Sequence, residues 1–190
     1  MNPLSTTRTW IIWTILLIVY VYMAAYIMRG ASESIATVAI DPICAIPFDL
    51  QIFGVSQTEA QKTMECFGEE GRKIYQGIAS HEDVAYPIAY GLFYAFTLFS
   101  LSSFCVERKG ITLVVTLIPP LIVISDLVEN HYIIEMIKQF PTLGAETVAS
   151  MSLFNSIKWG LFFSTLFLVL IFSIWSVVII VRRRKTPNSI

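Results

Sequence analysis

Hydrophobic residues along this chain are concentrated in four long runs, separated by segments that carry nearly all of the charges. The runs cover residues 10–28, 84–106, 111–134 and 157–181. A helical membrane span needs about 20 largely apolar residues, and each run meets that requirement. The chain has 190 residues and is 55% hydrophobic, which is too apolar for an ordinary soluble domain. We therefore predict an all-α membrane protein, in which residues 1–190 form a single membrane domain around a bundle of four transmembrane helices.

Basic residues predict how the four helices are oriented. Three basic groups fall on the same side of a four-span bundle: Arg8, the pair Arg108 and Lys109, and residues 182–185. The positive-inside rule assigns that side to the cytoplasm. The loops on the opposite side, residues 29–83 and 135–157, are rich in Asp and Glu. We therefore expect a multi-pass protein of the cell (inner) membrane with both its N and C termini in the cytoplasm.

The loop between the first two runs, residues 29–83, predicts a small extracytoplasmic helical cap. It is too long for a structureless connection inside a compact domain. Ser56 and Glu59 have the spacing of a capping box, and Gly68 stands where a helix end favours a left-handed residue. A second short helix is expected to follow Gly68. The preceding residues, 41–54, contain prolines and predict an extended strip across the surface of the bundle or membrane.

Cysteine and histidine positions limit the chemistry. Cys44 and Cys66 both fall in the outer loop, where an oxidising compartment would permit a disulfide, but the sequence does not decide whether they are joined. The absence of a C-x-x-C motif disfavours a thiol oxidoreductase. His81 and His131 do not have metal-ligand spacing, so neither a metal nor a cofactor is predicted. The basic residues adjoin a membrane, so no nucleic-acid partner is expected.

The third apolar run contains acidic residues, which are costly in hydrocarbon. Asp126, Glu129 and Asn130 are spaced i, i+3 and i+4, so they share one helix face. At 1.5 Å per residue from Ile111, Asp126 lies about 23 Å along a hydrocarbon core of about 30 Å. These side chains are therefore expected to face the interior of the bundle and to pair there.

Two neighbouring helices bring polar groups to the same level. Asp83, Tyr86 and Tyr90 form a stripe at the outer end of the second run, and Lys158 near the outer end of the fourth is the expected counter-ion of Asp126 or Glu129. Because acids outnumber this lysine, an excess acid would keep its proton or be balanced by a ligand cation. The predicted ligand-binding residues are Asp83, Tyr86, Tyr90, Asp126, Glu129, Asn130 and Lys158.

Short motifs along the chain resemble an uncharacterised family of small bacterial four-helix integral membrane proteins. The motifs are "FD…FG.S..EA…FGEEGR..Y", "D..YPIAYGLF" and "SDLVEN", followed by a lysine near the start of the last helix. Together they extend from Phe48 to Lys158. The resemblance implies a four-helix fold and a bacterial origin, and it implies no activity, because none is established for the family.

Three functions are compatible with these residues. The leading hypothesis is a protein that binds a lipid headgroup or small polar molecule in an outward-facing polar cavity. One alternative is a membrane-embedded enzyme acting on a lipid or prenyl substrate, with Asp126 or Glu129 as general base and Lys158 stabilising negative charge. Another is a structural or accessory subunit, in which the acids only lock helices together or mark a membrane boundary. The expected partners are membrane lipids, and a second copy or another membrane protein.

Overall fold

The computed structural model describes residues 7–52 and 54–185, and these residues form helices, turns and irregular segments without a strand. In chain order the elements are α1 (Thr7–Tyr22), the π-helix η2 (Met23–Met28), α2 (Arg29–Val38), the 3₁₀ helix η3 (Phe48–Leu50), α3 (Gln57–Ser80), α4 (Glu82–Cys105), α5 (Lys109–Gln139) and α6 (Ala145–Lys185). Four stretches are long and apolar enough to cross a membrane: Thr7–Val38, Gln57–Cys105, Lys109–Gln139 and Ala145–Arg183. The predicted all-helical fold and its four apolar helices are confirmed.

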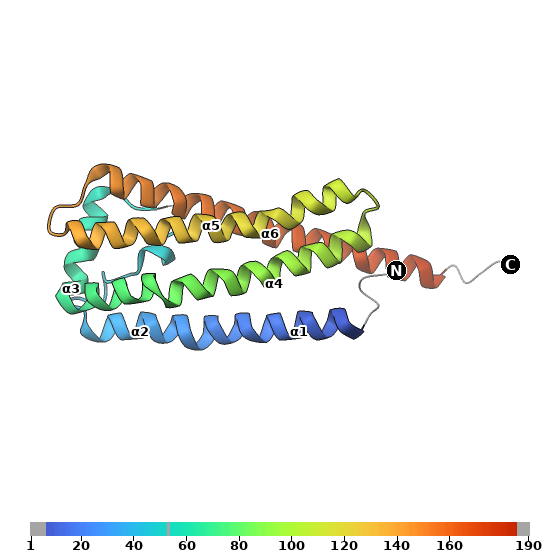
Figure 1. The fold of residues 1–190 in the computed structure, drawn as a ribbon, viewed down its shortest axis with the longest axis horizontal. Coiled ribbons are helices and arrows are strands. Elements are labelled where there is room, and N and C mark those ends of the chain that lie inside the picture. Colours follow the sequence, from blue (N-terminus) through green and yellow to red (C-terminus); the bar gives the residue numbers. More distant parts are fainter. Residues whose placement is uncertain (1–6, 53, 186–190) are drawn as a thin grey trace.

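The long helices form an elongated bundle in which α4 occupies the central position. It packs against α1 on one side and against α5 and α6 on the other (Figure 1). The start of α1, the turn between α4 and α5, and the end of α6 lie together at one end of the bundle (Figure 1). α3 lies at the opposite end, which we call the cap end.

The helices extend well beyond the apolar runs of the sequence. α2 continues the line of α1 as far as Val38, so the first part of the predicted outer loop is helical (Figure 1). Its Ile35 is buried in the core at the cap end. Likewise α6 begins at Ala145, well before the predicted start at residue 157. An apolar run marks only the part of a helix that is hydrophobic on all sides. The extensions bury one face and carry polar residues on the other, so they lie outside the apolar runs.

The cap region has the local structure predicted for α3. The Glu59 backbone N–H donates to the Ser56 hydroxyl, and the Ser56 backbone N–H donates to the Glu59 carboxylate, which completes the capping box. Gly68 has a φ of +68° and separates two helical segments. Cys44 and Cys66, whose pairing the sequence left open, form a disulfide.

Replacing Gly68 with alanine is expected to lower the free energy of unfolding by about 1–3 kcal/mol, because a left-handed backbone strains any residue with a Cβ. The new Cβ would also lie 2.9 Å from Cγ1 of Ile40. Gly77→Ala in the same helix is the matched control: nothing lies within 4 Å of its Cβ position. We expect that variant to be more stable by roughly 0.5–1 kcal/mol. Chemical unfolding of both variants measures the difference, and equal stabilities would contradict it.

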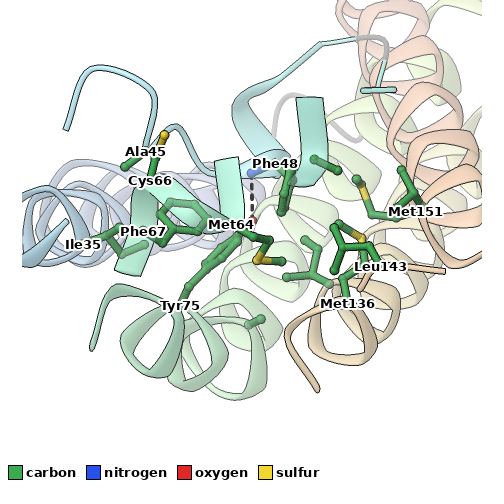
Figure 2. Packing of buried hydrophobic residues seen from close by; sticks show 14 of the residues in the cluster. Ile35, Ala45, Phe48, Met64, Cys66, Phe67, Tyr75, Met136, Leu143 and Met151 are labelled. Atoms are coloured by element: carbon green, nitrogen blue, oxygen red, sulfur yellow. Dashed lines mark hydrogen bonds between the residues drawn. The ribbon is translucent and has the colours of Figure 1, made fainter. Parts of the chain in front are cut away.

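The segment between α2 and α3, residues 39–52 with 54 and 55, forms what we call the strap. It was predicted to be an extended strip on the surface, but η3 turns it inward, and Phe48 is buried against Phe67 and Tyr75 (Figure 2). The backbone N–H of Phe48 donates to the Tyr75 hydroxyl at 2.9 Å, the bond drawn dashed in Figure 2. That aromatic core therefore holds the next strap residue, Asp49, inside the bundle.

Candidate functional site

An ion-pair triad joins α5 and α6 near the cap end. Lys158 Nζ lies 2.6 Å from Glu129 Oε2 and 3.3 Å from Asp126 Oδ1. All three side chains are buried. The i, i+3 spacing on α5 directs both carboxylates at the same point on α6. Lys158 thus contacts both of the acids that the sequence offered as its partner.

Asn155 of α6 connects the triad to the strap. Its side-chain amide donates to Glu129 Oε1 at 2.9 Å and to the carbonyl oxygen of Phe48 at 3.1 Å. Its Oδ1 accepts from the backbone N–H of Gly54 at 3.2 Å. Asn155 is fully buried, so these bonds are shielded from solvent. This residue lies one helical turn before Lys158, and it was absent from the predicted set.

The triad is also joined to α4 by hydrogen bonds. Tyr90 Oη donates to Asp126 Oδ2 at 2.6 Å, and both groups are buried. Asn130 of α5 donates from Nδ2 to the backbone carbonyl of Asp83 at 2.7 Å. α4, α5 and α6 are therefore joined by polar contacts at one level of the bundle.

A cavity of about 120 Å³ lies beside this network. Its lining residues are Asp49, Leu50, Asp83, Tyr86, Tyr90, Ile122, Asp126, Lys158, Trp159 and Phe162. Five of the seven predicted ligand-binding residues line it: Asp83, Tyr86, Tyr90, Asp126 and Lys158. The other two, Glu129 and Asn130, are buried outside the lining and act through their contacts with Lys158 and Asp83.

Carboxylates exceed cations around this cavity. Asp49, Asp83, Asp126 and Glu129 supply four carboxyl groups, and among the described residues that line the cavity Lys158 is the only cation. Asp49 accepts a hydrogen bond from Tyr75 Oη at 3.1 Å. Burial raises the pKa of the Asp49 carboxyl, against the opposing attraction of Lys158.

Asp83 differs from the other acids because its carboxylate has no partner. The residue is only 3% exposed and lines the cavity. Across the described part of the chain, no hydrogen bond or ion pair reaches its side-chain oxygens, although its backbone carbonyl is bonded to Asn130. A buried carboxylate normally finds hydrogen bonds or a cation. Without a ligand such a carboxyl keeps its proton, and a cation that enters the cavity can take the place of that proton.

The lining chemistry suits an organic cation. Within the described residues, no group of three or more His, Cys, Asp or Glu side chains is arranged to hold a metal ion. Aromatic rings form much of the wall instead, from Tyr86 and Tyr90 on α4 and from Trp159 and Phe162 on α6. Such rings attract cations through their electron-rich faces.

Sequence reasoning missed the lining residues that belong to the strap and to the outer turns of α6. Asp49 and Leu50 precede the first helix of the cap, and no periodicity connects them to the span that they meet. Trp159 and Phe162 lie in an apolar run, where an aromatic side chain is equally suited to lipid. One signal was present: Asp49 and Lys158 both belong to the motifs on which the family resemblance rests.

No protein-family model matches this chain, and no curated protein or solved structure is significantly similar to it. The resemblance to small bacterial membrane proteins therefore stays a prediction.

Proposed function

We propose that this chain is a multi-pass membrane protein that binds a small organic cation in the acidic cavity at the cap end. Membrane insertion is supported by the outward faces of the helices. On α6, for example, Phe167, Leu170 and Val177 are each more than half exposed, as suits contact with lipid. The end of the bundle opposite the cap carries Arg8, Lys109 and Arg182, and we assign that end to the cytoplasm.

The observation that carries the proposal is the unpartnered carboxylate of Asp83. Both carboxylates of the triad contact Lys158, and each accepts a further hydrogen bond, Asp126 from Tyr90 and Glu129 from Asn155, so the triad acts as a lock between α5 and α6. Asp83 stands outside that lock and lines the cavity. A ligand cation placed there would supply the missing counter-charge, and the rings of Tyr86 and Trp159 would add cation–π attraction.

The charges around the cavity also limit the ligand that the sequence suggested, a lipid headgroup or small polar molecule. A phosphate-bearing headgroup needs a cation for its phosphate, but Lys158 is already held between two carboxylates. The remaining acids repel an anion. An amine or a quaternary ammonium group is therefore favoured over a phosphate.

The enzyme alternative has weaker support from the same geometry. Asp126 and Glu129 were its candidate general bases, and both are paired with Lys158. A base must be free to take a proton from a substrate. Neither carboxylate has that freedom while the triad is intact.

The direct test is binding of butylammonium to the full chain in lipid nanodiscs, measured by calorimetry. Asp83→Asn keeps the shape of the side chain and removes its charge, so it should weaken binding by about tenfold or more. Glu82→Gln is the matched control, because Glu82 is the exposed neighbour of Asp83 and does not line the cavity.

Asp83→Asn should fold about as stably as the parent, since the amide has the size of the carboxyl and is as neutral as a carboxyl that keeps its proton. Equal affinity in Asp83→Asn and in the parent would overturn the assignment of the cation to Asp83. A parent chain that binds no ammonium compound would remove the proposed function altogether.

A further inference from the structure

The exposure of its lining residues points to an opening of the acidic cavity beside Leu50 of the strap. Among its described lining residues Leu50 is the most exposed, at 53%, whereas Asp83, Asp126 and Lys158 are buried. The neighbouring edge of the opening is Trp159 of α6, whose indole N–H donates to the carbonyl oxygen of Asp49 at 3.2 Å. The opening therefore lies where the strap meets α6.

The strap and the part of α6 that follows Trp159 both carry exposed apolar side chains. On the strap, Ile46 and Ile52 are exposed at 46% and 41%. On α6, Phe163 and Phe167 are exposed at 45% and 62%, on the turns that follow Trp159. If the helices span a membrane, such a surface contacts hydrocarbon. A ligand that enters here would come from the lipid phase.

A second, larger cavity of about 300 Å³ lies between α1, α4 and α6. We call it the groove, and its lining includes Trp13, Phe93, Leu101, Val169 and Ser173. It exists because α1 packs on α4 and has at most slight contact with α6. Apolar side chains dominate its walls, so it suits a hydrocarbon chain.

A ring contact joins the wall of the groove to the wall of the acidic cavity. Tyr94 lines the groove and Phe162 lines the acidic cavity, and their ring centroids are 5.7 Å apart. Along α4, the distance from Tyr90 to Ser100 at the other end of the groove is about 15 Å at 1.5 Å per residue. An acidic pocket and an apolar groove are thus placed end to end.

From this arrangement we infer that the ligand is a cationic amphiphile, which places its amine head at Asp83 and its alkyl chain in the groove. The chain passes between the two cavities when the rings of Tyr94 and Phe162 turn apart. This inference rests on the proposed function and adds the class of ligand and its route of entry. The acidic cavity accounts for the charge of the head, and the groove accounts for the chain. Entry past Leu50 from the membrane follows from the exposed apolar side chains of the strap and of α6.

The test uses dodecylamine with a photoreactive diazirine at the far end of its chain, added to the full chain in phosphatidylcholine nanodiscs. Because lipid is as apolar as the groove, the position of the label is more informative than the affinity. We expect labelling of Phe93, Leu101 or Val169, and its loss when butylammonium is added in excess. Mass spectrometry of the labelled peptides gives the positions.

Ser173→Phe should fill the groove and abolish this labelling, while butylammonium binding stays unchanged. Ser164→Phe is the matched control, because it places the same ring on an exposed position of α6 outside the groove. Labelling spread over lipid-facing residues would overturn the inference. So would labelling of the groove that persists in Ser173→Phe or in excess butylammonium. In those cases butylammonium binding would remain and the proposed function would stand. A parent chain that fails to bind butylammonium would overturn both.

Discussion

Lys158→Met is expected to lower the free energy of unfolding by about 3–5 kcal/mol, the usual loss when one partner of a buried ion pair is removed. The substitution would leave Asp126 and Glu129 as two like charges in a site that excludes water. Unfolding of the reconstituted protein by denaturant measures the change. Lys138→Met is the matched control, because Lys138 pairs with Glu135 on the exposed surface of the same bundle, and no measurable change is expected there.

A variant in which all three residues of the triad are neutral separates the effect of charge from the effect of packing. Lys158→Met combined with Asp126→Asn and Glu129→Gln removes the unpaired charges, so most of the lost stability should return. A triple variant no more stable than Lys158→Met alone would mean that packing of the lysine stem, and not charge pairing, joins α5 to α6.

Asn155→Ala is expected to produce the second largest effect, a loss of about 3 kcal/mol, because it leaves buried polar groups of Glu129, Phe48 and Gly54 without their bonds. The strap should also be held less firmly against α6, where the bonds of Trp159 to Asp49 and of Ser152 to Val55 remain. Hydrogen exchange of the backbone amides next to η3 should therefore become faster, together with the loss of stability.

Ser156→Ala is the matched control for Asn155→Ala. The Ser156 hydroxyl donates only within its own helix, to the carbonyl of Ser152. The free energy of unfolding of Ser156→Ala should stay within about 0.5 kcal/mol of the parent, and hydrogen exchange of the strap amides should not change. Strap exchange that is the same in Asn155→Ala as in the parent would show that Asn155 does not hold the strap.

Sequence periodicity predicted those features of the fold that depend on local chemistry. Four apolar runs predicted four helices, and the spacing of Ser56 and Glu59 predicted a capping box. The i, i+3 spacing of Asp126 and Glu129 predicted a shared face and a lysine partner. Each of these follows from neighbours along the chain or on one helix surface.

The parts that the sequence did not predict depend on contacts between distant segments. Phe48 turns the strap inward only because Tyr75 and Phe67 offer it an aromatic core, and Asp49 reaches the cavity as a consequence. From the sequence, all seven polar residues were predicted to belong to one ligand-binding site. The structure divides them into acids that pair with Lys158 and an Asp83 whose side chain has no partner among the described residues, a distinction that depends on contacts between helices.

We expect the cationic partner of Asp83 to come from outside the protein. The most direct measurement is a crystal structure of the full chain grown in a lipidic mesophase with 4-bromobenzylammonium, whose aryl bromine is not displaced, with the bromine located by anomalous scattering. We predict a bromine peak inside the acidic cavity, with the ammonium group against the Asp83 carboxylate and the rings of Tyr86 and Trp159. A well-ordered cavity without that peak, at a concentration that saturates binding, would contradict the account.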